Sequence, residues 1–143
     1  MNRAELEKVL PHRDTMLLLD SAEIGPDGAA YAKRLIRGDE FFLDGHFPGD
    51  PIVPGVILCE ILAQSACVLL RESAAGSTAL LTGLDRVKFK NPVRPGDTVE
   101  TRCVLTAQKG VFYRAEGEVH AGGRLCVSAQ FSFAVIDKQN EDK

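Results

Sequence analysis

The distribution of apolar and polar residues changes along the chain from a helical period to a period of two. Residues 55–73 are rich in Leu, Ile and Ala, contain no Pro and follow a Pro, a composition that predicts a long helix. Apolar side chains recur at mostly odd positions in residues 99–105, and residues 125–135 alternate similarly. Such alternation is typical of strands with one buried face, and the short turn sequences between them favour hairpins. The second half of the chain therefore predicts an antiparallel sheet.

Shorter elements are expected before the long helix. Pro11 stops an amphipathic helix, and the irregular stretch that leads to residue 55 has the length of a functional loop. With 143 residues, of which 45% are hydrophobic, the chain can bury a core as one domain over residues 1–143. The expected elements are a helix at residues 3–10, strands at 16–24 and 29–37, an irregular stretch at 38–54, the helix at 55–73 and four further strands.

The helix at residues 55–73 is apolar on every side rather than along one stripe, so it should be buried all round. One antiparallel sheet of about six strands covers only one side of such a helix. The other side needs either a second copy of the chain or an unusually extended loop. From this mismatch we predict a homodimer with an α+β fold.

Composition and charge argue against several classes of function. The 17 basic and 20 acidic residues give a net charge of −3, which is not typical of a protein that binds nucleic acid or a membrane surface. The first residues lack the apolar core of a signal peptide, and the longest lipophilic run is too short to span a bilayer. The cysteines, at positions 59, 67, 103 and 126, form no CxxC pair and have no His at ligand spacing. We therefore expect reduced thiols, no metal and a cytoplasmic protein.

Two polar residues in the apolar helix are candidates for chemistry. Glu60 is the only charged residue of this helix before Arg71, and Gln64 lies one turn later on the same face, where its amide can orient the carboxyl group. Burial raises the pKa of such a carboxyl group, while a helix N-terminus lowers it. The alternative is a helix edge at which Glu60 simply meets water or an Arg.

The loop before the helix supplies a second candidate. Glycines and prolines surround His46 and fix its backbone, and histidine is suited to proton transfer near neutral pH. A loop histidine by itself is more often incidental, but His46 and Glu60 together provide a base and an acid for an elimination. No catalytic role is expected for His120, on a charged strand face, and a structural role is favoured for His12, beside the helix stop.

The sequence GHFPGDPIVPGVILCEILAQ, at residues 45–64, resembles the signature of (3R)-3-hydroxyacyl-[acyl carrier protein] dehydratases of the FabZ type, in which His and Glu are likewise fourteen residues apart. The resemblance continues in Leu-Pro-His-Arg at residues 10–13, in Leu-Leu-Leu-Asp at 17–20 and over residues 86–97. It implies a hotdog fold, in which an antiparallel sheet wraps a long central helix. It also implies a dimer in which each active site takes His46 from one subunit and Glu60 from the other.

The same resemblance implies a reaction that needs no cofactor. His46 would take the C2 proton of a 3-hydroxyacyl thioester, Glu60 would protonate the departing C3 hydroxyl, and the backbone N–H of Gly55 would donate to the thioester carbonyl. Residues 14–16 depart from the family's usual pattern, and Glu60 stands where FabA-type dehydratase/isomerases have Asp, which favours dehydration without isomerisation. The residues expected to bind substrate are Phe47, Pro54, Gly55, Val56 and Gln64.

A local basic patch is the expected docking site for a partner protein. The patch consists of Arg86, Lys88, Lys90 and Arg94. No acidic residue lies between positions 86 and 94, and Val87 and Phe89 alternate with the first three basic residues. A strand there would bury the apolar side and present the four positive charges on one face. The resemblance implies that the partner is the acidic acyl carrier protein, which carries the substrate on phosphopantetheine. It also implies that dimers can assemble into trimers of dimers, as they do in the family. The alternative is a solvated strand face that discourages edge pairing.

Two other functions are compatible with this fold. A hotdog acyl thioesterase would use a carboxylate to activate water at the same carbonyl, but the Gly-His-Phe-Pro-Gly loop with its His–Glu pair argues against it. A subunit that binds acyl chains without chemistry would not need His46 and Glu60, and both are present.

Overall fold

The computed structural model describes residues 1–10, 12–44, 49–70 and 77–137. Within these residues the chain forms two α-helices, three short 3₁₀ helices and six strands. The helices are α1 (Arg3–Val9) and α2 (Gly55–Cys67), with 3₁₀ helices at Asp14–Met16, Phe41–Leu43 and Val68–Leu70. The strands are β1 (Ser21–Ile24), β2 (Ala30–Leu35), β3 (Ser77–Phe89), β4 (Thr98–Lys109), β5 (Phe112–Ala121) and β6 (Arg124–Asp137).

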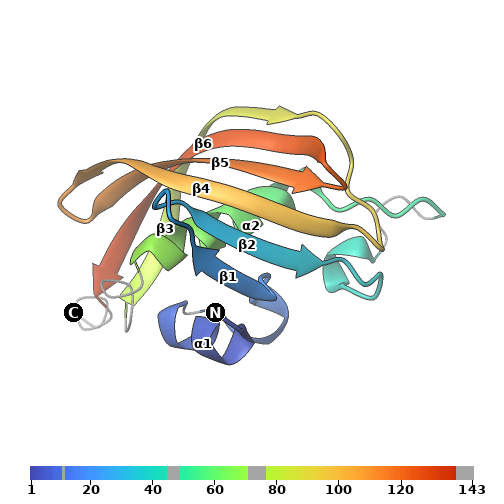
Figure 1. Ribbon diagram of the computed structural model, residues 1–143, viewed down its shortest axis with the longest axis horizontal. Coiled ribbons are helices and arrows are strands. Elements are labelled where there is room, and N and C mark those ends of the chain that lie inside the picture. The colour runs from blue at the N-terminus through green and yellow to red at the C-terminus, as the bar shows by residue number, and fades with distance from the viewer. Residues whose placement is uncertain (11, 45–48, 71–76, 138–143) are drawn as a thin grey trace.

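All these strands form one antiparallel sheet in the order β1-β2-β4-β5-β6-β3, so β1 and β3 are its edge strands. Short turns join β4, β5 and β6 into consecutive hairpins, as the turn sequences predict. The sheet curves around α2, whereas α1 lies below β1 (Figure 1). A helix wrapped by an antiparallel sheet is the hotdog arrangement, so the predicted α+β hotdog fold is confirmed.

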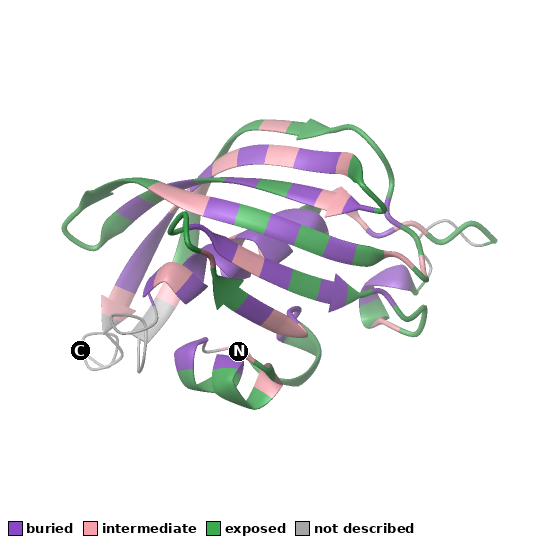
Figure 2. Ribbon diagram, viewed as in Figure 1, coloured by how far each residue is buried: buried purple, intermediate pink, exposed green. Residues whose placement is uncertain are grey.

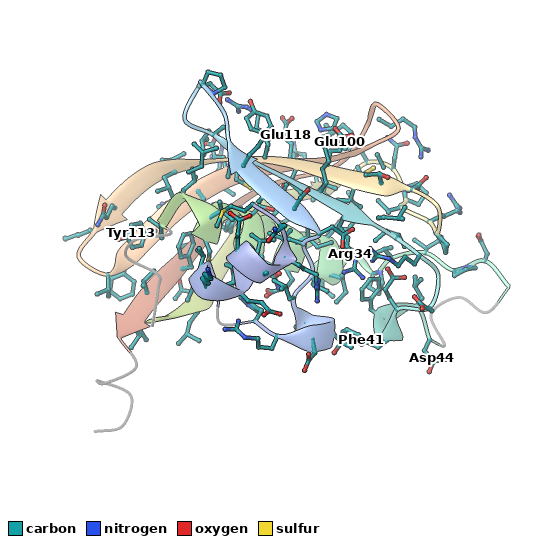
Figure 3. All side chains as sticks on the ribbon, turned by 60° about the horizontal axis from the view of Figure 1, so that its bottom comes forward. Arg34, Phe41, Asp44, Glu100, Tyr113 and Glu118 are labelled. Carbon is teal, nitrogen blue, oxygen red and sulfur yellow. The ribbon has the colours of Figure 1, made fainter. Side chains whose placement is uncertain are left out.

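Alternation along the strands gives the sheet an inner and an outer face. In β5, Tyr113, Ala115 and Val119 are buried, and charged residues at the intervening positions are exposed (Figure 2). Glu100 of β4 and Glu118 of β5 project from the face turned away from α2 (Figure 3). The alternation with a period of two in the sequence therefore identifies the face of the sheet that covers the helix.

A close approach fixes α2 against the inner face of the sheet. A Cβ atom on Gly117 of β5 would lie 2.8 Å from Cys103 Sγ and 2.9 Å from Leu62 Cδ2, so the helix could not sit this near to any larger residue. The buried hydroxyl groups of Ser65 on α2 and Thr101 on β4 hydrogen-bond to each other at 2.8 Å. This bond satisfies both polar groups within the apolar layer.

The central helix is shorter than predicted. It is α-helical to Cys67 and tightens into a 3₁₀ helix that ends at Leu70, while the rest of the predicted span lies outside the described residues. One stripe of α2 stays uncovered by its own chain: Val56 is 70% exposed, and Glu60 lies further along this stripe. Burial on all sides is therefore not reached within one chain. Among the described helices, none is long and apolar enough to cross a membrane.

The predicted strand at residues 16–24 is wrong in its first half. The strand begins only at Ser21, and residues 17–19 are irregular although their leucine side chains are fully buried. Three consecutive buried side chains do not fit a strand that has one buried face. The Arg3 guanidinium, rather than a neighbouring strand, donates to the carbonyl groups of Leu17 and Leu19, at 2.8 and 3.3 Å. The expected helix at residues 3–10 and strand at 29–37 are confirmed with slightly shorter bounds.

Candidate active site

Glu60 is held in position on α2 through one of its two carboxylate oxygens. Its Oε1 atom lies 3.2 Å from Nε2 of Gln64 and 3.2 Å from Nε2 of His12. Its Oε2 atom has no hydrogen-bond partner among the described residues. The side chain is 28% exposed, so a molecule on the uncovered stripe of α2 can reach it. The arrangement leaves one oxygen available to exchange a proton.

Gln64 is itself immobilised. Its side chain is fully buried, its Oε1 accepts from the backbone N–H of Leu18 at 2.9 Å, and its Nε2 donates to the carbonyl of Met16 at 2.8 Å. These bonds distinguish the amide oxygen from the nitrogen and direct one remaining N–H at Glu60. The contact that the sequence predicts between Gln64 and Glu60 is therefore present, and the segment after α1 supports it.

The environment of Glu60 acts on its pKa in two opposite ways. Burial raises the pKa, but hydrogen bonds from His12 and Gln64 outweigh burial, so the pKa is lowered from its ordinary value. At neutral pH Glu60 is consequently ionised in the free protein. An ionised carboxylate is ready to take a proton from water, and it must gain a proton before it can give one.

His12 contacts Glu60, which the sequence does not predict. The sequence favours a structural role for His12, and the structure places its Nε2 within hydrogen-bond reach of Glu60. The imidazole is largely buried, with 18% of its side chain exposed. The sequence signal that could have identified it is the Leu-Pro-His-Arg motif, because this motif recurs with the His–Glu signature in the family that the chain resembles.

The start of α2 carries further predicted residues. The carbonyl of Pro54 accepts from the N–H groups of Ile57 and Leu58, at 3.0 and 3.3 Å, which starts the helix. Gly55 is the first helical residue, so its N–H has no carbonyl one turn earlier to donate to. His46 and Phe47, the predicted base and one predicted substrate contact, lie outside the described residues, and their roles stay predictions.

A groove of about 480 Å³ opens at this end of α2. Gly55 and Val56 line it, together with Phe89 at the end of β3 and Lys90 just beyond. The Phe89 ring covers Gly55 so closely that a Cβ atom there would lie 2.5 Å from its Cε1 atom. Val56 and Glu60 are four residues apart and share one face of the helix. Two predicted substrate-binding residues therefore line a groove beside the face that carries Glu60.

The four residues of the predicted basic patch do not share one strand face, and this part of the prediction is wrong. β3 ends at Phe89, so Lys90 and Arg94 follow the strand. A register irregularity just before Lys88 includes Arg86, whose φ of 49° is in the left-handed region. This irregularity breaks the alternation that the prediction assumed. Phe89, which the alternation would place on the buried side, is 57% exposed.

The charges of the patch instead fall into two groups. Arg86 and Lys88 line a hollow on the outer face of the sheet, together with Arg102 and two glutamates of β5. Lys90 lines the groove at α2, and Arg94 forms an ion pair with Asp50, with 3.2 Å between Nε and Oδ1. Of the four residues, only Lys90 therefore lines the groove.

Other candidate groups lie apart from this site or are inert. His120 lies near the C-terminal end of β5, with its Nε2 3.9 Å from Glu118 Oε2. All four cysteines are free and buried, and burial followed by the nearby Glu60 charge raises the pKa of the Cys67 thiol to about 12. In the part of the chain that is described, no three His, Cys, Asp or Glu side chains are arranged to hold a metal ion.

Comparison with known proteins identifies the family. Residues 25–124 match the family model described as ApeI-like, ApeI dehydratase. The chain belongs to the ApeI-like dehydratase family. A curated relative of this ApeI-like chain, the 3-hydroxyacyl-[acyl-carrier-protein] dehydratase FabZ of Alkaliphilus metalliredigens (strain QYMF), is 37% identical over 148 residues, which cover 100% of the chain and 99% of the relative. The resemblance to FabZ-type dehydratases is thereby confirmed.

Solved structures share the fold of the ApeI-like chain. The dehydratase heterocomplex ApeI:P from Xenorhabdus doucetiae matches with a TM-score of 0.80 and 22% identity, covering 96% of this chain and 94% of that one. The fluoroacetyl-CoA-specific thioesterase FlK matches with a TM-score of 0.66 and 15% identity, covering 79% and 95%. Because dehydratases and thioesterases both adopt this fold, the choice between the two activities depends on the site.

Proposed function

We propose that this ApeI-like chain dehydrates (3R)-3-hydroxyacyl thioesters carried on acyl carrier protein to trans-2-enoyl thioesters, in fatty-acid or related polyketide synthesis. His46 removes a proton from C2, and Glu60 delivers a proton to the C3 hydroxyl, which leaves as water. The N–H of Gly55 donates to the thioester carbonyl as that oxygen gains negative charge. Family membership and the FabZ relative support the substrate class.

The observation that carries the proposal is the asymmetry of the Glu60 carboxylate. Oε1 is anchored by two donors, and Oε2 is without a partner among the described residues. An elimination needs a proton-transfer group with a fixed orientation towards the leaving hydroxyl, and this asymmetry supplies one. The lowered pKa of Glu60 keeps its carboxylate ionised, which is the form that can accept a proton in the reverse reaction, hydration of the enoyl thioester. By microscopic reversibility, the same group is the acid in dehydration.

The uncovered surface supports a homodimer. β3 is an edge strand, and it exposes Leu80, Leu81 and Leu84 by 42–46% each. A long apolar edge strand invites pairing with another chain. We propose that a second copy pairs there and covers the stripe of α2 that begins at Val56. Each active site then contains His46 of one subunit and Glu60 of the other.

The partner that delivers the substrate is acyl carrier protein. Lys90 lines the groove at α2 and offers positive charge to an acidic surface. Arg94 follows the lining residue Val93 and adds a second positive charge, which is shared with Asp50 in an ion pair. In this proposal the phosphopantetheine arm enters along the groove, past Phe89, and brings the thioester carbonyl to Gly55. The buried, unpaired cysteines suit a reducing compartment, and we propose the cytoplasm as the place of action.

The test is an assay with 3-hydroxybutyryl and crotonyl thioesters on acyl carrier protein. We expect reversible interconversion of the two, followed by mass spectrometry, with no release of free thiol. Thiol release without hydration would instead identify a thioesterase. Binding of both thioesters with neither reaction would identify an acyl-binding subunit, and either result would overturn the proposal.

A further inference from the structure

We propose that His12 is a positioning residue for Glu60: its Nε2–H holds Oε1 of the carboxylate, so that Oε2 faces the substrate. The inference rests on the proposed acid–base role of Glu60 and adds a residue to it. The distance of 3.2 Å between His12 Nε2 and Glu60 Oε1 is within hydrogen-bond reach.

The contact belongs to a larger arrangement in which one segment orients Glu60 by two routes. His12 reaches the carboxylate directly. Met16 and Leu18, a few residues later, fix the amide of Gln64, which donates to the same Oε1 atom. Two donors that converge on one oxygen from different elements restrict rotation of the carboxylate more than either donor alone. The second oxygen is thereby left in a defined direction.

The segment that carries His12 is itself held by two arginines. The Arg13 guanidinium donates to the carbonyl groups of Leu10 and His12, at 2.6 and 2.7 Å. The Arg3 guanidinium donates to the carbonyl groups of Asp14 and Leu17, at 2.8 Å each. These charge-assisted hydrogen bonds take the place of the backbone hydrogen bonds that a neighbouring strand would make. They fix the backbone from which the His12 side chain reaches Glu60.

The two ring nitrogens of His12 lie in different surroundings. Nδ1 is buried and has no hydrogen-bond partner in the described part of the chain, whereas Nε2 lies 3.2 Å from Glu60 Oε1. Nε2 is therefore the ring nitrogen that is placed to donate to the carboxylate.

Two cysteine thiols of α2 lie near Glu60 and are titratable. From α2, the Cys67 thiol senses the charge of Glu60, but its pKa is raised to about 12, by burial first and by Glu60 second. Cys59, next to Glu60 in sequence, also has a pKa raised by burial. Both thiols stay protonated in the working range, so a change in the pH dependence of the reaction on altering His12 reports on Glu60 or His46.

The experiment compares two amide variants, H12Q and H12N, in the hydration of crotonyl thioester. A Gln side chain reaches about as far as Nε2 of histidine and keeps a donor, whereas Asn is one methylene shorter and withdraws the donor from Glu60. The exposed-strand variant H120N is the matched control. All proteins are compared as dimers, with thermal denaturation to verify folding.

We expect H12N to lower kcat roughly 10- to 100-fold with little change in KM, because a misdirected carboxylate affects the reaction step rather than binding. H12Q should recover most of the rate. In H12N the acid limb of the pH profile should move to higher pH, because losing the donor raises the pKa of Glu60. Equal rates and equal acid limbs in H12Q and H12N, or an effect on KM alone, would overturn the inference.

A second measurement needs no variant of His12. Nitrogen NMR of ¹⁵N-histidine-labelled wild-type protein should report a proton on Nε2 of His12, with the signals assigned by means of H46A and H120N. A ring that carries its proton on Nδ1 and none on Nε2 would also overturn the inference. Failure of the proposed function is distinguishable, because the wild-type protein would then hydrate no thioester at all.

Discussion

The backbone N–H of Leu18 donates to Oε1 of Gln64 over 2.9 Å, which ties the irregular segment after α1 to the middle of α2. Both groups are fully buried. The bond explains why a polar side chain occurs in the apolar helix: it satisfies a backbone donor that no strand partner serves. The same amide then reaches Glu60, so a stabilising contact and a functional contact share one side chain.

Replacing Gln64 should therefore affect both stability and activity. Q64M keeps the approximate volume but leaves the buried N–H of Leu18 without its partner, whereas the carbonyl of the exposed Met16 can turn to water. At about 1–3 kcal/mol for a buried unpaired group, the free energy of unfolding should fall by about 1–3 kcal/mol. Urea denaturation measures this loss, with the exposed-site variant Q108M as control. Equal stability of the two variants would contradict the proposed role of the buried amide.

The chemistry of Glu60 predicts that shape alone does not preserve activity. In E60Q the amide has a similar size and can still hydrogen-bond, but it cannot deliver a proton to the leaving hydroxyl. Turnover of 3-hydroxyacyl substrate should fall by roughly 10²- to 10⁴-fold, nearly as far as in E60A. Steady-state rates of the two folded variants give the comparison. Substantial activity in E60Q would reduce Glu60 to an orienting residue.

Much of the fold follows from local patterns in the sequence. β4, β5 and β6 alternate at period two because each covers α2 with one face, and their turns contain glycines with positive φ at Gly110, Gly122 and Gly123. The start of α2 is evident from the Pro54-Gly55 pair. Pattern and structure agree wherever one face of an element is buried by a regular partner.

The disagreements arise where contacts between distant residues override the local pattern. Residues 17–19 have the composition of a strand, but the Arg3 and Gln64 side chains bond to this stretch, and all three leucines are buried. Phe89 belongs to an alternating run, yet its ring covers Gly55. The contact between His12 and Glu60 is likewise not evident from the sequence, because no local period relates the two residues. The sequence identifies the chemical groups, and long-range packing decides which of them meet.

The proposed division of the active site between subunits can be tested by mixing variants. H46A and E60A should each form folded dimers that lack most dehydration activity, because each removes one proton-transfer group. When the two are mixed and allowed to exchange subunits, a heterodimer contains one site with both residues intact. We expect up to a quarter of wild-type activity if dimers form statistically, because about half are mixed and each has one of two sites. No recovery after demonstrated exchange would assign both residues to the same subunit.

The close approach of Phe89 to Gly55 predicts a compensating pair. In G55A the new methyl group would overlap the ring and displace it, because a Cβ atom would lie 2.5 Å from Cε1. We expect kcat/KM to fall roughly tenfold, as overpacking costs about 1–3 kcal/mol. F89L removes the ring, so G55A should cost much less in that background. A double-mutant cycle checks this coupling, and additive effects would contradict it.

The two groups of basic residues predict different effects on the carrier-linked substrate. Lys90 lines the groove and Arg94 follows the lining residue Val93, whereas Arg86 and Lys88 line a hollow on the outer face of the sheet. Reversing the charges in K90E/R94E should therefore lower kcat/KM for acyl carrier protein substrate roughly tenfold at low salt, and less at high salt.

R86E/K88E should have a smaller effect, because neither residue lines the groove, and K109E, at the far end of β4, serves as a surface control. Turnover of the same acyl group on a short pantetheine thioester separates docking from chemistry, since this substrate lacks the protein surface. It should be nearly unchanged in K90E/R94E. Equal losses on both substrates would mean that Lys90 and Arg94 support the groove itself rather than the encounter with acyl carrier protein.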